Sequence, residues 1–459
     1  MNVLLLAIDT LRADHLSCYN YRRPTSPSID RLASEGVRCS NFMAAGIPTH
    51  PSFTTLFSGQ HPIRHGVVEH GGPHHLHNDT VTIPQLFLDR GYLTASFDNL
   101  PGHKPHFGRG FEMLVDSSKR RGCGLMVTCE DINSRLVPFL KQSSQGKDPF
   151  FAFVHYWDPH TPYWAPSRYR NLFYSGDPCD PAKKTLQPLY DHPLGPRWRE
   201  IWFNRVLQDS GRDPSKEITD AAYVEAMYDQ EIRHVDDGIA DVLDTLDETG
   251  LAENTLVVLI ADHGECMTEH GVNFDHHGLY DENLHVPLIA RLPGRIPAGR
   301  VADQLVQHFD ILPTLCEAAD LKTPAQSGTP AESARVIDGK SAWGIMTGQR
   351  GDEVLNSTLV SEECTWQKKW SYRDANYHFI LARQTDWYEN PMRELYDLKA
   401  DPKATQNIAE LKPDIAGELE RQLEDWIATR AKACGRAGDP LLETEVTLID
   451  PKARRSHKK

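Results

Sequence analysis

Five short, continuous apolar runs recur along the chain, at Val3–Ile8, Leu93–Phe97, Phe150–His155, Thr255–Ala261 and Val286–Arg291. Runs of this length without polar alternation are typical of strands buried on both faces of a parallel sheet. Segments with helical periodicity lie between them, at Pro27–Glu35, Ser52–Ser58, Ile83–Arg90, Asp131–Lys141 and Thr219–Thr249. Strand–helix alternation predicts an α/β fold with a doubly wound sheet flanked by helices.

The pattern changes after a Pro-, Gly- and Ser-rich stretch at 323–340. Short alternating segments follow at Thr358–Ser361, Trp370–Arg373, Tyr377–Ala382 and Glu394–Asp397, and an amphipathic helix is expected over Pro413–Arg430. We therefore expect a large domain over 1–345 and a smaller α+β domain with a basic tail over 346–459. Residues 165–218 of the large domain show little helical or strand periodicity. They form either an insertion that acts as a lid or a surface excursion with no role in the active site.

The net charge and the composition limit the classes of binding partner that the protein is expected to have. The 459 residues carry 49 Lys and Arg against 64 Asp and Glu, a net charge of -15, which is opposite to the balance of a nucleic-acid-binding protein. No stretch approaches the about 20 apolar residues of a membrane span. The nine cysteines form no CxxC pair, and the N-terminus lacks the features of a signal peptide. We expect a cytoplasmic protein with reduced thiols and neither nucleic acid nor membrane as partner.

Carboxylates follow two of the predicted strands. Asp9 ends the first, and the fourth runs into Ala261-Asp262-His263-Gly264-Glu265. Ligands in open α/β sheets bind beyond the carboxyl ends of the strands, so these side chains are expected to converge. Gly264 permits the sharp backbone turn that would aim adjacent ligands at one cation, and a mixed O/N set suits Zn or Mn better than Ca or Mg. The structural alternative is a pair of helix-capping Asp residues with an incidental His.

Thr49 precedes a helix that Pro51 is suited to begin, in Gly46-Ile47-Pro48-Thr49-His50-Pro51-Ser52. Backbone N–H groups at a helix N-terminus favour an anion. A hydroxyl there, bound to a metal, would have a lowered pKa and act as a nucleophile. The alternative is an ordinary N-cap.

Histidines crowd two regions. Six lie between His61 and His77 with irregular spacing, which is more typical of a polar loop than of a metal site. His276 and His277 follow Asp262–His263 closely and precede a buried strand, which favours an active-site role. Asp158 and His160 follow the third strand.

Six ordered motifs together resemble the sulfatase branch of the alkaline phosphatase superfamily along nearly the whole chain. They are Asp9-Thr10-Leu11-Arg12-Ala13-Asp14 with Pro27–Ala33; Asp158-Pro159-His160-Thr161-Pro162-Tyr163; Tyr228-Asp229 with Val235-Asp236-Asp237; Asp262-His263-Gly264-Glu265; His277-Gly278-Leu279-Tyr280 with Val286-Pro287; and Glu394-Leu395-Tyr396-Asp397-Leu398. The resemblance implies an alkaline-phosphatase-like mixed sheet and one metal site made by Asp9, Thr49, Asp262 and His263.

The chain departs from the sulfatase pattern at the nucleophile. Sulfatases carry Cys or Ser in a C-x-P-S-R motif that is oxidised to formylglycine, whereas the matching stretch here is Thr49-His50-Pro51-Ser52-Phe53. Oxidation of Thr would give a ketone, so formylglycine is excluded. Two lysines that the family uses to contact sulfate are absent. His276 takes the place of one, and the segment Phe97–Leu100 contains no lysine where the family carries the other. Thr nucleophiles and a single opening Asp resemble the superfamily's phosphodiesterases and phosphonate monoester hydrolases.

The resemblance implies an enzyme whose substrate is a small anionic ester. Thr49 would attack phosphorus in a phosphate diester or phosphonate monoester, while His160, His276 or His277 binds the anion or protonates the leaving oxygen. The cofactor is expected to be a divalent metal ion, Mn or Zn before Ca. A second ion held by Asp158, His160 and His277 is an open alternative.

Two other functions remain open at this stage. One is sulfate ester hydrolysis without formylglycine, and the more remote one is a catalytically dead binding protein. Many cytoplasmic relatives assemble, so a homo-oligomer is a further expectation.

Overall fold

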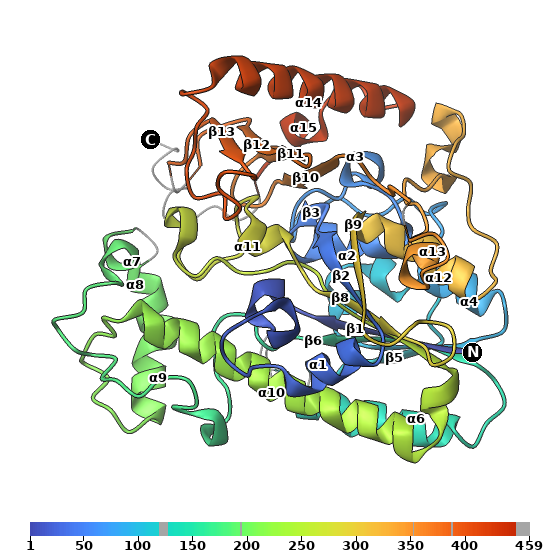
Figure 1. Cartoon of the computed structure of the whole chain (residues 1–459), viewed down its shortest axis with the longest axis horizontal. Coiled ribbons are helices and arrows are strands. Elements are labelled where there is room, and N and C mark those ends of the chain that lie inside the picture. The colour runs from blue at the N-terminus through green and yellow to red at the C-terminus, as the bar shows by residue number, and fades with distance from the viewer. Residues whose placement is uncertain (119–126, 193–194, 352, 387–388, 447–459) are drawn as a thin grey trace.

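The computed structural model describes residues 1–118, 127–192, 195–351, 353–386 and 389–446. The structure contains two β-sheets (Figure 1). The large sheet has eight strands in the order β5-β4-β6-β1-β7-β8-β2-β9, and the small sheet has five strands in the order β13-β12-β11-β10-β3. The strands are β1 (Asn2–Ile8), β2 (Val37–Met43), β3 (Gly46–Ile47), β4 (Leu93–Phe97), β5 (Met113–Val115), β6 (Phe150–Tyr156), β7 (Thr255–Ala261), β8 (Leu288–Arg291), β9 (Arg300–Gln307), β10 (Leu359–Glu363), β11 (Lys369–Arg373), β12 (Tyr377–Ala382) and β13 (Arg393–Asp397).

The large sheet is mixed, as predicted. Strand β1 runs parallel to both β6 and β7, whereas β8 pairs antiparallel with β7 and with β2. The five apolar runs of the sequence are β1, β4, β6, β7 and β8. Strands β2 and β9 were not predicted, because polar residues interrupt their apolar pattern. Strand β9 lies at the edge of the sheet and is only partly buried.

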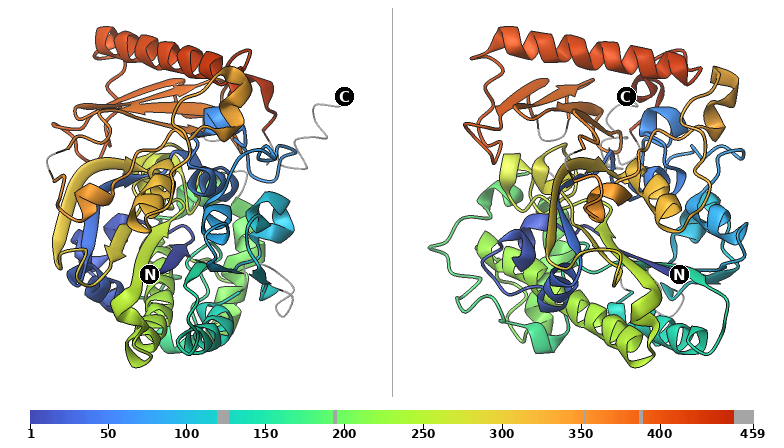
Figure 2. Two further views of the ribbon diagram at one scale, coloured as in Figure 1. Left: turned by 90° about the vertical axis from the view of Figure 1, so that its right-hand side faces the viewer. Right: turned by 45° about the vertical axis from the view of Figure 1, so that its right-hand side comes forward.

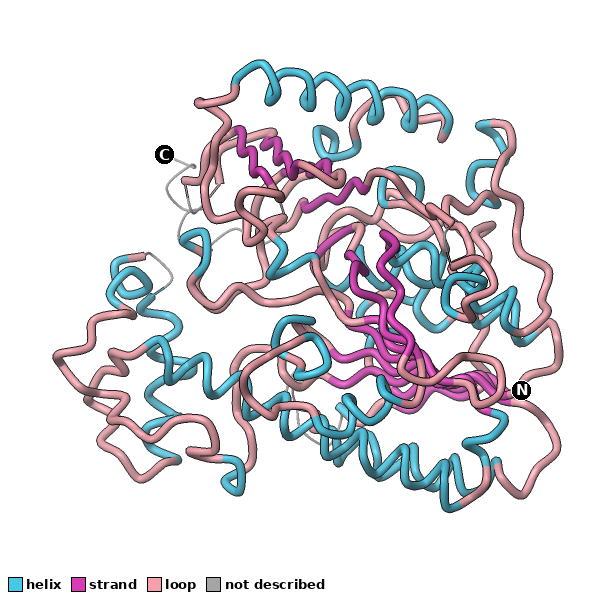
Figure 3. The backbone as a smooth tube through the Cα atoms, in the orientation of Figure 1, coloured by secondary structure: helices cyan, strands magenta, loops and turns pink. Residues whose placement is uncertain are grey.

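Helices cover both faces of the large sheet. Helices α1, α6 and α10 lie on one face, and α2, α4, α12 and α13 lie on the other, toward the small sheet (Figures 1 and 3). The helices are α1 (Pro27–Ser34), α2 (Thr49–Ser58), α3 (Pro62–His65), α4 (Ile83–Leu88), α5 (Leu100–His103), α6 (Cys129–Ser143), α7 (Gln187–Asp191), α8 (Gly195–Trp198), α9 (Asn204–Asp209), α10 (Ala221–Glu248), α11 (Asp281–Leu284), α12 (Ile311–Ala318), α13 (Trp343–Met346), α14 (Pro413–Ala433) and α15 (Pro440–Glu443).

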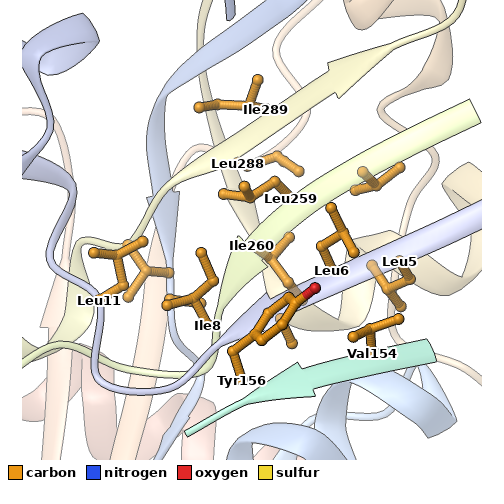
Figure 4. Close-up of a cluster of buried hydrophobic side chains, with 14 of the residues drawn as sticks. Leu5, Leu6, Ile8, Leu11, Val154, Tyr156, Leu259, Ile260, Leu288 and Ile289 are labelled. Carbon is orange, nitrogen blue, oxygen red and sulfur yellow. The ribbon is translucent and has the colours of Figure 1, made fainter. Parts of the chain in front are cut away.

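The core of the large sheet is made by the apolar runs themselves. Side chains of β1, β6, β7 and β8 pack side by side at its centre (Figure 4), and Leu5, Leu6, Val154, Leu259 and Ile289 are all fully buried there. Burial of such aliphatic side chains stabilises a fold by about 1.5–3 kcal/mol each. The strand ends that carry Asp9 and Asp262 are therefore rigidly held.

The small sheet joins the two ends of the chain. Its strand β3 comes from the N-terminal segment and pairs parallel with β10. The Ser361 hydroxyl also donates a hydrogen bond to the Ala44 carbonyl oxygen, 2.6 Å away. Helix α14 covers the outer face of this sheet (Figure 2). The loop that leads to Thr49 is thus anchored in the small sheet.

The described residues of 165–218 include a short π-helix at Arg199–Phe203 and several short helices beside the N-terminal part of α10. The buried Trp202 ring packs against Tyr163, with centroids 4.9 Å apart, and lies 6.3 Å from the Phe274 ring. This segment therefore supports the loops that carry His160 and Asp275. Among the described residues, no helix is long and apolar enough to cross a membrane.

Candidate active site

Asp9, Asp262 and His263 meet at the carboxyl ends of the neighbouring strands β1 and β7. Each offers a ligand atom within 4.8 Å of the others, and all three side chains are buried. Since β1 and β7 are parallel and in register from Asn2 to Ile8, the residues that follow them emerge at one edge of the sheet.

The unpaired atoms of this group point to a cation. Asp9 Oδ1 and Asp262 Oδ2 are buried without a hydrogen-bond partner among the described residues. The other Asp262 oxygen, Oδ1, accepts hydrogen bonds from the backbone N–H groups of Thr10 and His263, at 3.2 and 2.9 Å. One oxygen of each carboxylate is therefore left for a ligand, and a buried unpaired carboxylate oxygen is costly without one.

His263 presents a lone pair to the same place. Its Nδ1 lies 3.0 Å from the Gly264 carbonyl oxygen, which can only accept, so Nδ1 carries the hydrogen. Burial lowers the pKa of His263, which keeps the ring neutral. Nε2 is then an acceptor, as a metal ligand must be.

Thr49 stands over these three residues. Its Oγ1 lies 3.3 Å from His263 Nε2, and the side chain is 2% exposed. Helix α2 begins at Thr49 itself, with Pro48 as the N-cap, so the prediction that Thr49 precedes the helix is wrong by one position. The Ser52 hydroxyl donates to the Asp262 carbonyl oxygen at 2.8 Å and so fixes the start of α2 against the end of β7.

The ionisation of the two carboxylates differs. Burial and the neighbouring Asp9 carboxylate raise the pKa of Asp262 well above its usual value. Burial also opposes ionisation of Asp9, but the hydrogen bond from His155 and the nearby imidazoles outweigh it and lower the Asp9 pKa. Two adjacent carboxylates cannot both stay ionised without added positive charge.

A buried imidazole stands behind Asp9. His155, on β6, donates from Nε2 to Asp9 Oδ2 at 3.1 Å and from Nδ1 to Asp98 Oδ1 at 2.9 Å. Burial disfavours its charge, yet the two carboxylates raise the His155 pKa to about 10. Sequence reasoning missed this role, although an ionisable residue inside a buried apolar strand is a signal that a partner exists.

The predicted histidines His160, His276 and His277 do gather at this site. The His276 ring lies 4.9 Å from the His263 ring and 5.0 Å from the His160 ring, between centroids. His160 donates from Nδ1 to the Thr161 carbonyl oxygen at 2.6 Å and is partly exposed. His277 is fully buried and donates from Nδ1 to Glu363 Oε1 at 2.6 Å.

Asp158 does not join His160 and His277. Its Oδ2 accepts from the Cys129 backbone N–H at 2.9 Å, and its nearest ionisable neighbours are Glu231 and His234. The set Asp158, His160 and His277 is therefore not assembled as one cation site in the described structure.

The irregular histidine cluster contributes one ring to the surroundings of Thr49. His70 stacks on His50, with centroids 3.9 Å apart, and the pKa of His70 is lowered by burial to about 3. His103 lies 5.8 Å from His50. The irregular spacing of these histidines matches neither a helix nor a strand, so the sequence could not show that His70 in particular lies near Thr49.

The nearby cationic side chains are engaged elsewhere. Lys104 is buried and its Nζ donates to the carbonyl oxygens of Gly72 and His74. Arg12 donates to Asp14, Glu269 and the Glu265 carbonyl oxygen. The Phe53 ring packs on the His155 ring, with centroids 4.8 Å apart. Among the described residues, imidazoles thus take the positions around Thr49.

Known proteins resemble this chain over most of its length. It is 26% identical over 471 residues to the Delta 4,5-hexuronate-2-O-sulfatase of Bacteroides thetaiotaomicron, covering 94% of this chain and 89% of that protein. It is 25% identical to the multifunctional alkaline phosphatase superfamily protein PehA of Trinickia caryophylli, over 89% and 91% of the two chains. The crystal structure of a phosphonate monoester hydrolase of Agrobacterium radiobacter superposes with a TM-score of 0.69 at 22% identity, over 94% and 96%.

Two family models also match. The model described as N-sulphoglucosamine sulphohydrolase, C-terminal, matches residues 268–430, and the model described as Sulfatase matches residues 1–321. The Sulfatase model spans more than half of the chain, and the chain also has the fold and the strand-end residues that are expected of this family. The protein is therefore an ester hydrolase that belongs to the sulfatase family of the alkaline phosphatase superfamily.

Proposed function

We propose that the protein is a divalent-cation-dependent hydrolase of phosphate diesters or phosphonate monoesters, with the Thr49 hydroxyl as its nucleophile. The observation that carries the proposal is the position of Thr49 Oγ1, 3.3 Å from His263 Nε2 in a buried cradle with two unpaired carboxylate oxygens.

The residues present fit a divalent ion. Asp9 Oδ1, Asp262 Oδ2, His263 Nε2 and Thr49 Oγ1 form the expected O/N ligand set, which suits Mn or Zn better than Ca. A divalent ion held there supplies Lewis-acid charge, which lowers the pKa of a neighbouring hydroxyl and polarises an ester oxygen.

The chain itself orients the nucleophile. The neutral His263 ring holds the Thr49 hydroxyl in place in this structure, because its Nδ1 is committed to the Gly264 carbonyl and its Nε2 lone pair faces Thr49 Oγ1 at 3.3 Å. With a cation bound, that lone pair would ligate the ion and would no longer accept the hydroxyl hydrogen. Thr49 is also the first residue of α2, where free backbone N–H groups and the helix dipole favour an anion. Thr49 Oγ1 would give up its proton to water and form a bond to phosphorus as the bond from phosphorus to the ester oxygen breaks. Water would then attack phosphorus, break the Oγ1–P bond and return Thr49 to its hydroxyl form.

His160 is the residue we propose to protonate the leaving oxygen. Its Nδ1 is fixed by the Thr161 carbonyl, and Nε2 makes no hydrogen bond within the described residues. Its partly exposed ring lies one ring away from His263, with His276 between them. A general acid needs a proton on its free nitrogen, so His160 would act as the doubly protonated imidazolium, with Nδ1–H on the Thr161 carbonyl and Nε2–H directed at the leaving oxygen.

Sulfate ester hydrolysis is the second candidate, because several relatives of this chain are named sulfatases. Two features argue against it as the main activity. Thr49 cannot become formylglycine, and the ammonium of Lys104 is directed at backbone carbonyls instead of an anion. Sulfate monoesters and phosphate diesters both carry one negative charge, so some cross-activity is expected.

The test compares matched p-nitrophenyl esters at saturating Mn or Zn, with the metal content of the enzyme measured in parallel. We expect kcat/KM for the phosphodiester and the phosphonate monoester to exceed that for the sulfate. A metal-loaded enzyme that cleaves the sulfate fastest would instead establish a sulfatase that works without formylglycine.

A further inference from the structure

The turn between β10 and β11, residues 364–368, brings the small sheet to the candidate active site. Thr365 Oγ1 accepts a hydrogen bond from the backbone N–H of His70 at 3.1 Å. The next residue, Trp366, stacks on His277, with ring centroids 4.5 Å apart and ring planes 15° apart. Two consecutive residues of one turn thus contact two histidine-bearing segments that are far apart in the sequence and reach the same site.

A row of four rings connects the nucleophile to this turn. His263 Nε2 lies 3.3 Å from Thr49 Oγ1. The His276 ring lies 4.9 Å from the His263 ring and 4.9 Å from the His277 ring, between centroids, and the Trp366 ring follows on His277. Trp366 is therefore three ring contacts from His263, at the rim of the site, in position to meet the group that leaves and not the ester bond itself.

Trp366 differs from other aromatic side chains that contact histidines of the site. Phe53, Phe153 and Trp157 contact the His155 ring, and all three are buried. The indole N–H of Trp157 is also used, since it donates to an amide oxygen at 3.1 Å. Trp366 is partly exposed. A partly exposed indole has apolar ring surface that a ligand can cover.

Two buried polar atoms of the turn have no hydrogen-bond partner among the described residues, namely the donor Trp366 Nε1 and the acceptor Gln367 Oε1. The Gln367 side chain is only 1% exposed and is held in place, because its Nε2 donates to Glu363 Oε2 at 2.9 Å. Glu363 also accepts from His277 Nδ1 at 2.6 Å. Buried polar atoms normally have partners. The turn therefore offers one donor and one acceptor beside an aromatic ring, which is the composition of a small-molecule subsite.

We propose that Trp366 is a specificity-determining residue that stacks on a ring of the leaving group, with Trp366 Nε1 and Gln367 Oε1 free to bond its polar substituents. This role rests on the proposed function and deepens it, because it names the substrates as esters whose leaving group is a ring and not an open chain. Indole rings bury a large apolar area at a low cost in conformational entropy. Aromatic and saturated rings share this apolar face, and the test separates them.

The test uses three methylphosphonate monoesters, with p-nitrophenyl, cyclohexyl and ethyl leaving groups, on the metal-loaded full-length enzyme. All three release methylphosphonate, which ³¹P NMR quantifies, and the intrinsic reactivity of each ester cancels when a variant is compared with the wild type. We expect Trp366→Ala to lower kcat/KM about 10-fold for the p-nitrophenyl ester and less than about 2-fold for the ethyl ester. A loss for the cyclohexyl ester as well would extend the class to saturated rings, and no loss there would confine it to aromatic rings. Equal losses for the p-nitrophenyl and ethyl esters, or no loss for either, would overturn the proposal.

The matched control is Trp426→Ala. Trp426 is also a partly exposed indole that contacts a buried histidine, His61, with ring centroids 4.9 Å apart, but it lies on α14 over the outer face of the small sheet. Its loss is expected to leave the preference between the esters unchanged. Trp366→Leu covers the case in which Trp366→Ala does not fold, because leucine keeps apolar volume against His277 without an aromatic ring. It is expected to lower the preference for the p-nitrophenyl ester over the ethyl ester about 3-fold or more, and an unchanged preference would contradict the proposal.

Failure of this role and failure of the proposed function give different results. Turnover of the phosphonate esters that depends on Thr49, with an unchanged preference in Trp366→Ala, would overturn only the role of Trp366. If sulfate esters are the better substrates, the proposed function fails, and the same comparison with p-nitrophenyl, cyclohexyl and ethyl sulfate still tests the role of Trp366.

Discussion

Gly264 shows how closely the residues of the cation site are packed. A Cβ at this position would lie 1.9 Å from the Glu282 carbonyl oxygen. The sequence suggested a glycine needed for a sharp turn, but its φ is not positive. The reason for glycine is the close approach of the backbone that precedes β8, which also accepts the Gly264 N–H through the Asn283 carbonyl at 2.8 Å.

We expect Gly264→Ala to lower the free energy of unfolding by about 1–3 kcal/mol, the usual cost of overpacking a filled interior. The control is Gly417→Ala on the exposed side of α14, where a Cβ meets nothing within 4 Å. Alanine there is expected to stabilise the helix by about 0.5–1 kcal/mol. Urea unfolding measures both, and a neutral Gly264→Ala would show that the loop can move away.

Some residues of the site could be read from the sequence and others could not. Asp9, Asp262 and His263 were predictable, since polar residues that end parallel strands meet at one edge of the sheet. The support of His155 by Asp98 depends on the pairing of β4 with β6, which the sequence does not specify. Glu363 reaches His277 across 86 residues of chain.

At the scale of elements, the buried apolar runs and the short strands β10 to β13 of the small sheet were predicted to within one or two residues, whereas the polar strands β2 and β9 were missed. The sequence suggests that one strand ends at Ser361, because Glu is rarely favoured in strands. The structure extends β10 through Glu362 to Glu363, because β3 and β11 pair with it on both sides. That extension carries Glu363 to His277.

The start of α2 was also placed too late. Its first turn, Thr49-His50-Pro51, reads as a loop because Pro and β-branched residues have low helix propensity. Pro is tolerated in the first turn, where no intrahelical partner is needed for its nitrogen. The strand β3 and the Ser52–Asp262 hydrogen bond hold this turn in place.

Several buried imidazoles among the described residues are kept neutral by their surroundings. Burial lowers the pKa of His61 and of His308 to about 4. Burial also lowers the pKa of His106 and of His378 to about 3. In the unfolded chain each of these histidines would have a pKa of about 6.5. At pH values between about 6.5 and the lowered pKa values, the unfolded chain therefore binds more protons at these histidines than the folded chain does.

These neutral imidazoles should therefore lower the free energy of unfolding as the pH drops from 7 toward 4. Buried groups whose pKa is raised act in the opposite direction, among them Asp236 and Asp310, each with a pKa of about 6, and Asp158, with a pKa of about 8. The contribution of one imidazole is measured by comparing His378→Gln with the wild type in thermal unfolding between pH 7.5 and 4.5. The variant is expected to lose less stability on acidification than the wild type, and an equal or larger loss would contradict this prediction.

The most direct test of the whole account is the turnover of Thr49 variants on the p-nitrophenyl phosphonate at saturating cation, with bound metal and unfolding temperature measured on the same samples. Thr49→Ala is expected to lose kcat by about 10³-fold or more while remaining folded. Thr49→Ser, with an intact mass that shows an unmodified side chain, is expected to keep much more activity because it retains a hydroxyl. Substantial turnover by metal-loaded Thr49→Ala would contradict the role of Thr49 as nucleophile.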